Sequence, residues 1–579
     1  MRGYGKYVKP YFRAFLIGPC LMIAEVVGEI LLPKMMSLII NNGVANQDQG
    51  YIVQMGLMMA AVAFFMAVSG IGGAYFSAKA SICFTSDLRR DLFERVQQFS
   101  FRNIDEFSTG SLVTRLTNDI QQVQMVMMMI LRLALRAPGM LIGALIMAFI
   151  MNYRLAMIIL VVIPVLGALI AAIMLTAYPR FGIMQTKLDK LNSGIQEALV
   201  NVRVIKSFVR EDFEKERFRM ANEDLQENSL RALRIVILTM PVMMLAMNVT
   251  TLAVVWYGGN LIIGGSMQVG DLTAFTTYIV QILMSLMMLS MVFLQSARAM
   301  ASVKRINQVM ETKIDLTDEN AKQKEQKVTK GKVEFRDVSF RYGKENSEKV
   351  LEHISFTAEP GQMIGIIGAT GSGKTSLVQL IPRLYDVTSG QVLVDGVDVR
   401  EYSLENLRDG VGMVLQKNVL FSGTIEENLR WGNEKASMEE LREFAVAAQA
   451  DGFVSSFADG YDTDMGQGGV NVSGGQKQRL CIARALLKKP KILILDDSTS
   501  AVDTATEAKI RECFQTALEE TTKIIIAQRI GSVEEADQIL VLDEGKIIGM
   551  GSHTELLASC EAYQEIYYSQ REKEREVIA

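Results

Sequence analysis

The residues best suited to chemistry in this chain lie in the glycine-rich segment GATGSGKT, at residues 368–375. An apolar strand is predicted directly before it, at 363–367, and a helix directly after it. In this context the glycines let backbone N–H groups curl around phosphate oxygens, and the helix N-terminus adds its positive end. We expect Lys374 to reach the β- and γ-phosphates of a nucleotide, and the Thr375 hydroxyl to coordinate Mg²⁺. The predicted phosphate loop comprises Gly368, Ala369, Thr370, Gly371, Ser372, Gly373, Lys374, Thr375 and Ser376.

A second stretch, residues 471–503, combines a glycine turn, a helical run and an apolar strand that ends in two acids, Asp496 and Asp497. An apolar strand that delivers acids to its C-terminal end is how P-loop proteins arrange groups around Mg²⁺ and a nucleotide. The second acid is unusual, because a glutamate would reach further toward an attacking water. The glycine turn is formed by Ser473, Gly474, Gly475 and Gln476.

Tyr342 lies after a predicted strand and directly before Gly343. An aromatic ring at this position could stack on the adenine face of a nucleotide. The alternative is a partly buried tyrosine in a turn, and the residue alone does not decide between the two.

The composition divides the chain of 579 residues into two kinds of sequence. The first 300 residues or so carry long apolar runs, and the rest resembles an ordinary soluble α/β protein. A net charge of −4 gives no reason to expect a nucleic-acid partner. The five cysteines are scattered, so free thiols are expected rather than disulfides. We therefore expect a transmembrane domain at 1–310, a charged linker at 311–330 and a nucleotide-binding domain at 331–579.

Six apolar segments are long enough to cross a bilayer, which takes about 20 helical residues. They lie at residues 15–40, 51–76, 131–151, 155–178, 235–263 and 272–291. Basic residues gather in the two long connections, so the positive-inside rule places these connections and the N-terminus in the cytoplasm. Each long connection has helical periodicity on both sides of a turn, near 103–110 and 202–211, and would project about 35–40 Å beyond the membrane.

These patterns predict a multi-pass protein of the cell membrane. The expected fold is a six-helix α transmembrane domain with long cytoplasmic helical extensions, followed by an α/β P-loop nucleotide-binding domain with its ATP site in the cytoplasm.

Charged residues also occur inside the predicted spans, where lipid makes them costly. Glu25 and Glu29 are one helical turn apart in the first span, and Arg132 and Arg136 are likewise one turn apart at the start of the third. One interpretation is that they face the bundle interior and pair with neighbours. The other is that Glu25 and Glu29 line a substrate cavity that prefers cations, with Arg136 as a further candidate residue of that cavity.

Together these motifs resemble those of an ABC exporter half-transporter, in which the membrane domain precedes the ATP-binding domain, and the resemblance covers nearly the whole chain. GATGSGKT is similar to the Walker A loop, VSGGQ at 472–476 to the family signature, and ILILDD at 492–497 to Walker B. SAVD at 500–503 is similar to the D-loop, VLQKNVLF supplies the Q-loop glutamine, Gln416, and Tyr342 takes the adenine-stacking position.

The resemblance implies that two chains pack head to tail and hold ATP between one chain's Walker A loop and the other chain's signature. Ser473 and the following glycines would then meet the γ-phosphate bound to the partner. Thr375, Gln416 and Asp496 would surround Mg²⁺, the last through water. The two turns in the long connections would transmit closure to the spans, giving alternating access.

Three residues depart from the family pattern. Asp497 stands where a catalytic glutamate is usual, Gln528 where a switch histidine is usual, and Gln467 where a glutamate usually precedes the signature. Loss of one methylene retracts the Asp497 carboxylate by more than about 1 Å, which can cost on the order of 10²-fold in rate. Asp496, Asp497 and Gln528 are thus the predicted catalytic residues, the last two degenerate.

This pattern predicts the impaired subunit of a heterodimeric, multidrug-type exporter, whose partner keeps the glutamate and the histidine but has an altered signature. A homodimer with two slow sites is the alternative. The expected activity is ATP-driven export of hydrophobic or amphipathic small molecules. Flipping of lipid or lipid-linked molecules, peptide export, and a channel or regulator gated by ATP remain alternatives.

Overall fold

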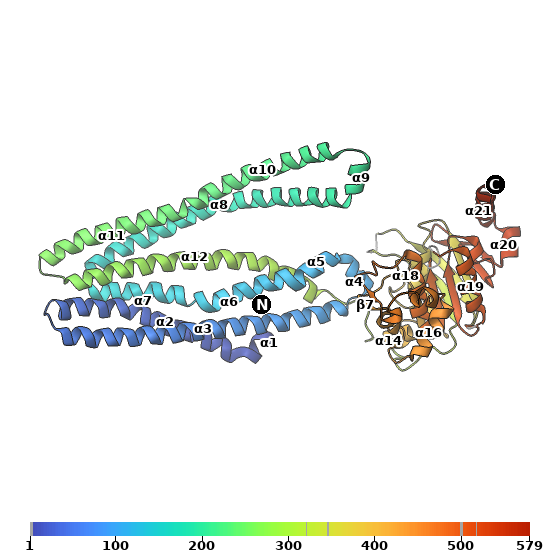
Figure 1. Cartoon of the computed structure of the whole chain (residues 1–579), viewed down its shortest axis with the longest axis horizontal. Helices are drawn as coiled ribbons and strands as arrows, with labels where there is room; N and C mark the ends of the chain where they lie inside the picture. Colours follow the sequence, from blue (N-terminus) through green and yellow to red (C-terminus); the bar gives the residue numbers. More distant parts are fainter. Residues whose placement is uncertain (1–3, 320, 344–346, 498–501, 517, 579) are drawn as a thin grey trace. The chain divides into compact units, whose positions relative to one another are not determined.

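The structure, a computed structural model, describes residues 4–319, 321–343, 347–497, 502–516 and 518–578. The chain folds into two compact units (Figure 1). The first contains residues up to 97 and residues 110–311, and the second contains 98–109 together with 312 onward. The short segment 98–109 therefore belongs to the second unit, although it lies between helices of the first in the sequence.

The first unit is built of helices. After the short helix α1 (Gly5–Val8) its long elements are α2 (Phe12–Leu38), α3 (Gln49–Gln97), α5 (Thr109–Thr114), α6 (Ile120–Leu133), α7 (Arg136–Met151), α8 (Tyr153–Val200), α9 (Val202–Ser207), α10 (Glu211–Ile237), α11 (Thr239–Ile263) and α12 (Val269–Glu311). Helices α2 and α3 lie side by side, as do α8 and α10, whose tips are joined by α9 (Figure 1). Buried side chains of α7, α8, α11 and α12 form a core around Phe275, Tyr278 and Ile282.

Six helical stretches in the described part of the chain are long and apolar enough to cross a membrane, which confirms the six predicted spans. Helix α3 has 49 residues and α8 has 48. At 1.5 Å per residue each is about 72 Å long, more than twice the ~30 Å hydrocarbon core of a bilayer. These helices therefore extend well beyond the lipid, as the sequence predicts.

The second unit contains a six-stranded sheet in the order β12-β11-β3-β10-β9-β6, in which only β12 runs antiparallel to its neighbour. Its strands are β3 (Met363–Gly368), β6 (Val411–Val414), β9 (Ile492–Asp496), β10 (Thr522–Ile526), β11 (Gln538–Asp543) and β12 (Lys546–Gly551). A four-stranded antiparallel sheet has the order β2-β1-β4-β5, with β1 (Val333–Phe340), β2 (Leu351–Ala358), β4 (Ser389–Val394) and β5 (Val397–Asp398). Strands β7 (Gly423–Thr424) and β8 (Asp464–Met465) pair separately.

Two hydrophobic cores cover the two faces of the six-stranded sheet. Along β9, Ile492 and Ile494 belong to the core shared with the antiparallel sheet, whereas Leu493 and Leu495 belong to the core shared with the helices. Successive side chains of a strand point to opposite faces, so a continuous apolar strand fits burial on both sides.

The helices of the second unit are α4 (Phe101–Glu106), α13 (Lys374–Gln379), α14 (Leu404–Asp409), α15 (Ile425–Arg430), α16 (Met438–Ala447), α17 (Asp451–Val454), α18 (Gly474–Leu487), α19 (Thr504–Thr516), α20 (His553–Ser559) and α21 (Glu561–Ile578). All five cysteines of the chain are free.

The neighbouring strands β3, β10 and β9 are parallel, so their carboxyl ends meet at one edge of the sheet. Asp496 ends β9 and Asp497 follows it, while Gln528 and Gln416 come after the parallel strands β10 and β6.

Candidate functional site

The predicted phosphate loop joins β3 to α13 at the carboxyl edge of the sheet. Its backbone requires glycine: φ is +154° at Gly368, and a Cβ there would stand 2.1 Å from the carbonyl oxygen of Leu542. Lys374 Nζ donates hydrogen bonds to the carbonyl oxygens of Gly368 at 2.8 Å and Ala369 at 2.7 Å. Burial lowers the pKa of Lys374, although Asp496 and Asp497 oppose this effect. The phosphate loop thus holds the Lys374 ammonium group against its own backbone, where its positive charge suits the binding of a phosphate.

Asp496 ends β9 and is buried, with 1% of its surface exposed. Its Oδ1 accepts a hydrogen bond from Thr375 Oγ1 at 3.0 Å. Asp496 Oδ2 and Ser372 Oγ are also buried, and neither makes a hydrogen bond with any described residue. Burial raises the pKa of Asp496. Buried polar atoms normally have partners, so these two oxygens are suited to a bound ligand.

The oxygens of Thr375 and Asp496 fit a Mg²⁺ ion, which prefers hard oxygen donors. In the described residues, no cluster of three histidine, cysteine or acidic side chains could hold a metal alone. A Mg²⁺ ion at this position would therefore take further oxygens from nucleotide phosphates and water, as is usual for this ion.

Two of the three residues that depart from the family pattern, Asp497 and Gln528, are hydrogen-bonded to each other. Gln528 Nε2, on the loop after β10, donates to Asp497 Oδ2 at 2.7 Å. Asp497 has φ +49°, and its N–H donates to the carbonyl oxygen of Ile526 at 3.1 Å, so its backbone is held by the adjacent strand. Burial raises the pKa of Asp497, while the hydrogen bonds of Gln528 and Gln416 and the charge of Lys374 work against that rise. The Asp497 carboxylate is thus held by hydrogen bonds from the side-chain amides of Gln528 and Gln416.

Tyr342 follows β1 and lies beside the phosphate loop. Its hydroxyl is 2.7 Å from Ser376 Oγ, and its ring meets Phe340 edge-on at 4.8 Å. The ring of Tyr385 also meets Tyr342 edge-on, at a centroid distance of 5.0 Å and an angle of 87°. Tyr342 remains 38% exposed, so part of its ring is available for stacking. The residue is a partly buried tyrosine beside the helix that follows the phosphate loop, and its stacking on adenine stays a prediction.

The signature turn lies at the exposed N-terminus of the 14-residue helix α18. Ser473 Oγ accepts a hydrogen bond from the N–H of Gln476, and Gln476 Oε1 accepts one from the N–H of Ser473 at 2.8 Å. These two reciprocal hydrogen bonds form a capping box, which fixes the conformation of the turn. The hydrogen bonds of these two side chains stay within the turn, so the structure does not bring them to the chain's own phosphate loop. Of the predicted D-loop, residues 500 and 501 lie outside the described residues.

Comparison with known proteins identifies the family. Residues 15–286 match the family model for the ABC transporter transmembrane region, and residues 351–500 match the model for the ABC transporter. An uncharacterized ABC transporter ATP-binding protein of Bacillus subtilis, YfiB, is 40% identical over 564 residues, which cover 97% of each chain. The chain belongs to the ABC transporter family.

Other relatives extend over nearly the same length. An uncharacterized ABC transporter ATP-binding protein of Mycobacterium tuberculosis is 39% identical over 98% of this chain and 97% of its own. An ATP-dependent lipid A-core flippase of Aromatoleum aromaticum is 33% identical over 90% of this chain and 85% of its own. A solved bacterial Atm1-family ABC exporter with ATP bound is 25% identical, with a TM-score of 0.77 and coverage of 97% and 98%. The transporter is thus a multi-pass membrane ATPase with the fold of an ABC exporter.

The segment 98–109 connects α3 to α5 in the sequence but packs with the nucleotide-binding domain. Tyr385 Oη donates to Asp105 Oδ2 at 2.8 Å, and the Tyr385 ring lies 6.1 Å from that of Phe101. The buried Asn103 donates to the carbonyl oxygen of Lys313 at 3.2 Å. Burial and Asp105 both raise the pKa of Tyr385, so its hydroxyl stays a donor. Helix α4 is therefore fixed to a tyrosine that touches Tyr342.

Replacing Tyr385 with phenylalanine should weaken coupling between ATP use and transport. Tyr385→Phe keeps the ring contacts with Tyr342 and removes the hydrogen bond to Asp105. A loss of about 1 kcal/mol corresponds to about a fivefold fall in molecules transported per ATP. The measurement is the ratio of transport rate to ATPase rate in proteoliposomes.

Tyr461→Phe is the matched control, because Tyr461 Oη also donates to an aspartate, Asp451, at 2.9 Å, but Tyr461 belongs to the other hydrophobic core than the one that Tyr385 packs against. This variant should keep the wild-type ratio. Equal ratios in Tyr385→Phe and wild type would show that this hydrogen bond does not carry coupling.

Three of the charged residues predicted inside the spans, Glu25, Glu29 and Arg136, form one cluster. Arg136 Nη1 contacts Glu25 Oε1 at 3.0 Å, and Arg136 Nη2 contacts Glu29 Oε2 at 3.1 Å, so α7 is tied to α2. Arg132 is exposed and lies in α6, which ends before α7 begins at Arg136. Ala134 and Leu135 form a turn between the two helices but keep right-handed helical backbone angles, so Arg132 and Arg136 lie in one helical stretch. Pairing with a neighbour is what the structure shows for both glutamates.

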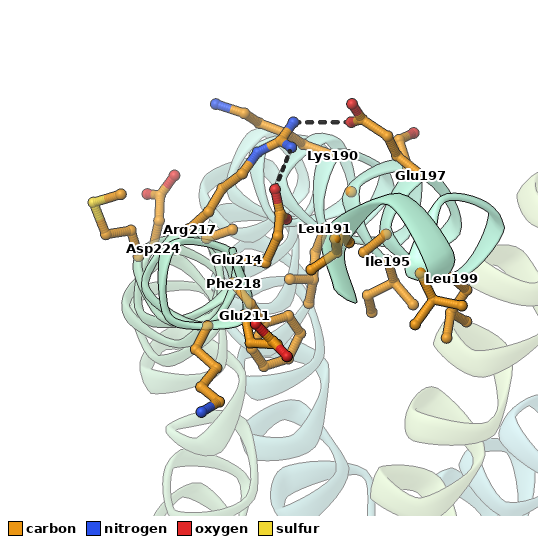
Figure 2. A pocket seen from close by; sticks show the side chains of 18 of the residues that line it. Lys190, Leu191, Ile195, Glu197, Leu199, Glu211, Glu214, Arg217, Phe218 and Asp224 are labelled. Atoms are coloured by element: carbon orange, nitrogen blue, oxygen red, sulfur yellow. Dashed lines mark hydrogen bonds and ion pairs between the residues drawn. The ribbon is translucent and has the colours of Figure 1, made fainter. Parts of the chain in front are cut away.

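A groove of about 940 Å³ lies between α8 and α10 near the tip formed by α9 (Figure 2). Apolar side chains of Leu191, Ile195 and Phe218 line it. Its rim is charged, with Arg217 contacting Glu197 at 2.9 Å. The turn predicted near 202–211 is thus confirmed as a short helix between two long ones.

Sequence reasoning missed Tyr385 and Asp105, which are 280 positions apart. The aromatic residue after the helix of the phosphate loop gives no periodic signal, and Asp105 lies in a short polar turn. Only the packing of α4 beside β1 and the phosphate-loop helix reveals the contact.

Proposed function

We propose that the transporter is the degenerate-site half of a heterodimeric exporter of hydrophobic or amphipathic small molecules. The observation that carries this proposal is the hydrogen bond between Gln528 and Asp497. A general base must hold an attacking water, yet this carboxylate is one methylene short and already accepts a bond from a neutral amide. Gln528 donates without being able to become a cation. The chain's own site would therefore bind MgATP and hydrolyse it slowly.

The intact signature supports a role at the partner's ATP. Ser473 and Gly474 are exposed at the start of a 14-residue helix, whose N-terminal N–H groups and dipole favour an anion. In a head-to-tail dimer this turn would complete the site of a partner that keeps the catalytic glutamate and the switch histidine. In that arrangement the partner's site would hydrolyse ATP. This chain's own site would bind ATP and hydrolyse it only slowly, and we call it the holding site.

The substrate class is supported by a cavity of about 470 Å³ between α6 and α12. One part of its lining is apolar, from Met125, Val126 and Met129. The rest of the lining is polar or charged: Asn118, Asp119, Gln122, Gln295, Ser302 and Arg305. A mixed lining of this size suits a ligand with both an apolar body and a polar group. Methionine adds a flexible surface that can fit ligands of different shape.

Lipid flipping is the second candidate, because a relative at 33% identity is named as a lipid A-core flippase. A homodimer with two slow sites is the second candidate for assembly, since Asp497 could still act as a weak base.

Accumulation of an amphipathic dye in inside-out vesicles tests the function. Vesicles that contain this chain and its partner half-transporter should accumulate the dye severalfold with ATP, and not with a non-hydrolysable analogue. Equal dye flux with the analogue would contradict pumping and indicate a gate. Movement of a fluorescent lipid without movement of the dye would contradict small-molecule export and favour the flippase.

A further inference from the structure

The C-terminal helix α21 contacts the loop that carries Gln528. Gln570 Nε2 donates to the backbone carbonyl oxygen of Gln528 at 2.8 Å, and Gln570 Oε1 accepts from the backbone N–H of Ile530 at 2.9 Å. One side-chain amide thus satisfies a backbone acceptor and a backbone donor two residues apart, as the peptide group of a neighbouring strand would. Gln570 lies 42 positions beyond Gln528, so the two meet only through the fold.

The same loop is held from the other side by α19. Ser532 Oγ donates to the buried carboxylate of Glu507 at 2.5 Å, and Arg511 Nη1 donates to the carbonyl oxygen of Gly531. These bonds fix residues 531 and 532, whereas the bonds of Gln570 fix 528 and 530. Gln570 therefore anchors the end of the loop from which the side chain of Gln528 reaches Asp497.

The first half of helix α21 is anchored in the hydrophobic core of the second unit. The Tyr563 ring is fully buried, and its hydroxyl lies 2.7 Å from Nδ1 of His553, on α20. Tyr563 also belongs to the core beneath the six-stranded sheet. Gln570 lies about two helical turns beyond this anchor, so its amide is presented by a fixed helix rather than by a loose end.

We propose that Gln570 is a positioning residue of the nucleotide site, which holds the loop so that the Gln528 amide stays on Asp497. This inference rests on the proposed role of Asp497 and Gln528 at a holding site. Helix α21 thereby becomes part of the machinery that keeps ATP bound, although it contributes no atom to the phosphate loop. Displacement of α21 would loosen the hydrogen bond from Gln528 to the Asp497 carboxylate, which Gln416 would still contact, and shorten the residence of the nucleotide.

The test measures release of radiolabelled MgATP from the full-length chain in lipid nanodiscs after a chase with unlabelled ATP. Gln570→Ala should release nucleotide faster by about three- to tenfold, the effect of losing two hydrogen bonds to a loop. Gln570→Glu keeps the shape and the acceptor for Ile530 but loses the donor to Gln528, so it should also release faster. Initial affinity should change little, because Lys374 and Tyr342 are untouched.

A double-mutant cycle separates positioning from general stability. In a Gln528→Ala background, Gln570→Ala should cause no further acceleration, because the side chain it positions is gone. Gln564→Ala is the matched control on the same helix, since Gln564 Nε2 donates to the carbonyl oxygen of Leu557 at 2.8 Å and not to the loop. It should release nucleotide at the wild-type rate.

Additive effects of the Gln570 and Gln528 substitutions, or equal acceleration by Gln564→Ala, would overturn the positioning role. Brisk hydrolysis of the bound ATP by the wild-type chain would instead contradict the holding site, and the cycle would still report whether positions 570 and 528 are coupled. Failure of the positioning role of Gln570 can therefore be distinguished from failure of the holding-site proposal.

Discussion

The double substitution Asp497→Glu with Gln528→His is expected to raise ATP hydrolysis at this chain's own site by about 10- to 100-fold. The glutamate restores the missing methylene and carries its carboxylate more than about 1 Å further toward the attacking water. The histidine removes the amide that binds Asp497 Oδ2 and adds a donor that can carry positive charge. Phosphate release from the purified full-length chain measures the effect.

Asp497→Glu alone and Gln528→His alone should each give only a small part of this rise in hydrolysis, because the other unusual residue still limits the site. Asp543→Glu provides a matched control: Asp543 is the last residue of β11, another strand that ends at the same edge of the sheet. It should leave hydrolysis unchanged. A full rise from Asp497→Glu alone would show that Gln528 does not limit the site.

Replacing Arg136 with glutamine should destabilise the membrane unit by about 3–5 kcal/mol. The substitution leaves Glu25 and Glu29 without the guanidinium that pairs with both. Each carboxylate would then be held inside the helix bundle with no opposite charge, which is costly at membrane depth. Thermal unfolding of the transporter in nanodiscs measures the loss.

Arg132→Gln is the control, because Arg132 lies one helical turn earlier and is exposed. It should melt near the wild-type temperature. Removing all three charges, with Glu25→Gln and Glu29→Gln added to Arg136→Gln, should recover much of the stability, since no unpaired charge remains. If Arg136→Gln and Arg132→Gln melt alike, the cluster is not what joins α2 to α7.

This cluster also bears on the substrate. The hypothesis that Glu25 and Glu29 line a cavity that prefers cations rests on their negative charge, and Arg136 is hydrogen-bonded to both. With both glutamates ionised the three groups carry one net negative charge rather than two. The cation preference of the cavity stays a prediction, and the geometry gives the cluster a structural role as well.

The parts of the site that follow from local sequence were predictable. The phosphate loop is a contiguous segment between a strand and a helix, and the apolar spans are set by the thickness of the bilayer. The partners of Asp497 were not predictable, because Gln528 is 31 positions away and meets it only where β9 and β10 lie side by side. Gln570 and Tyr385 depend on tertiary packing in the same way, and their residue types give no periodic pattern.

The nucleotide recovered from the purified full-length chain shows whether this chain's own site holds ATP without hydrolysing it. The chain is incubated with MgATP long enough for many turnovers of an intact site, unbound nucleotide is removed, and the bound fraction is separated into ATP and ADP. A holding site, with the Asp497 carboxylate bonded to Gln528, predicts that most of the bound nucleotide is still ATP. Bound nucleotide that is mainly ADP would contradict the account.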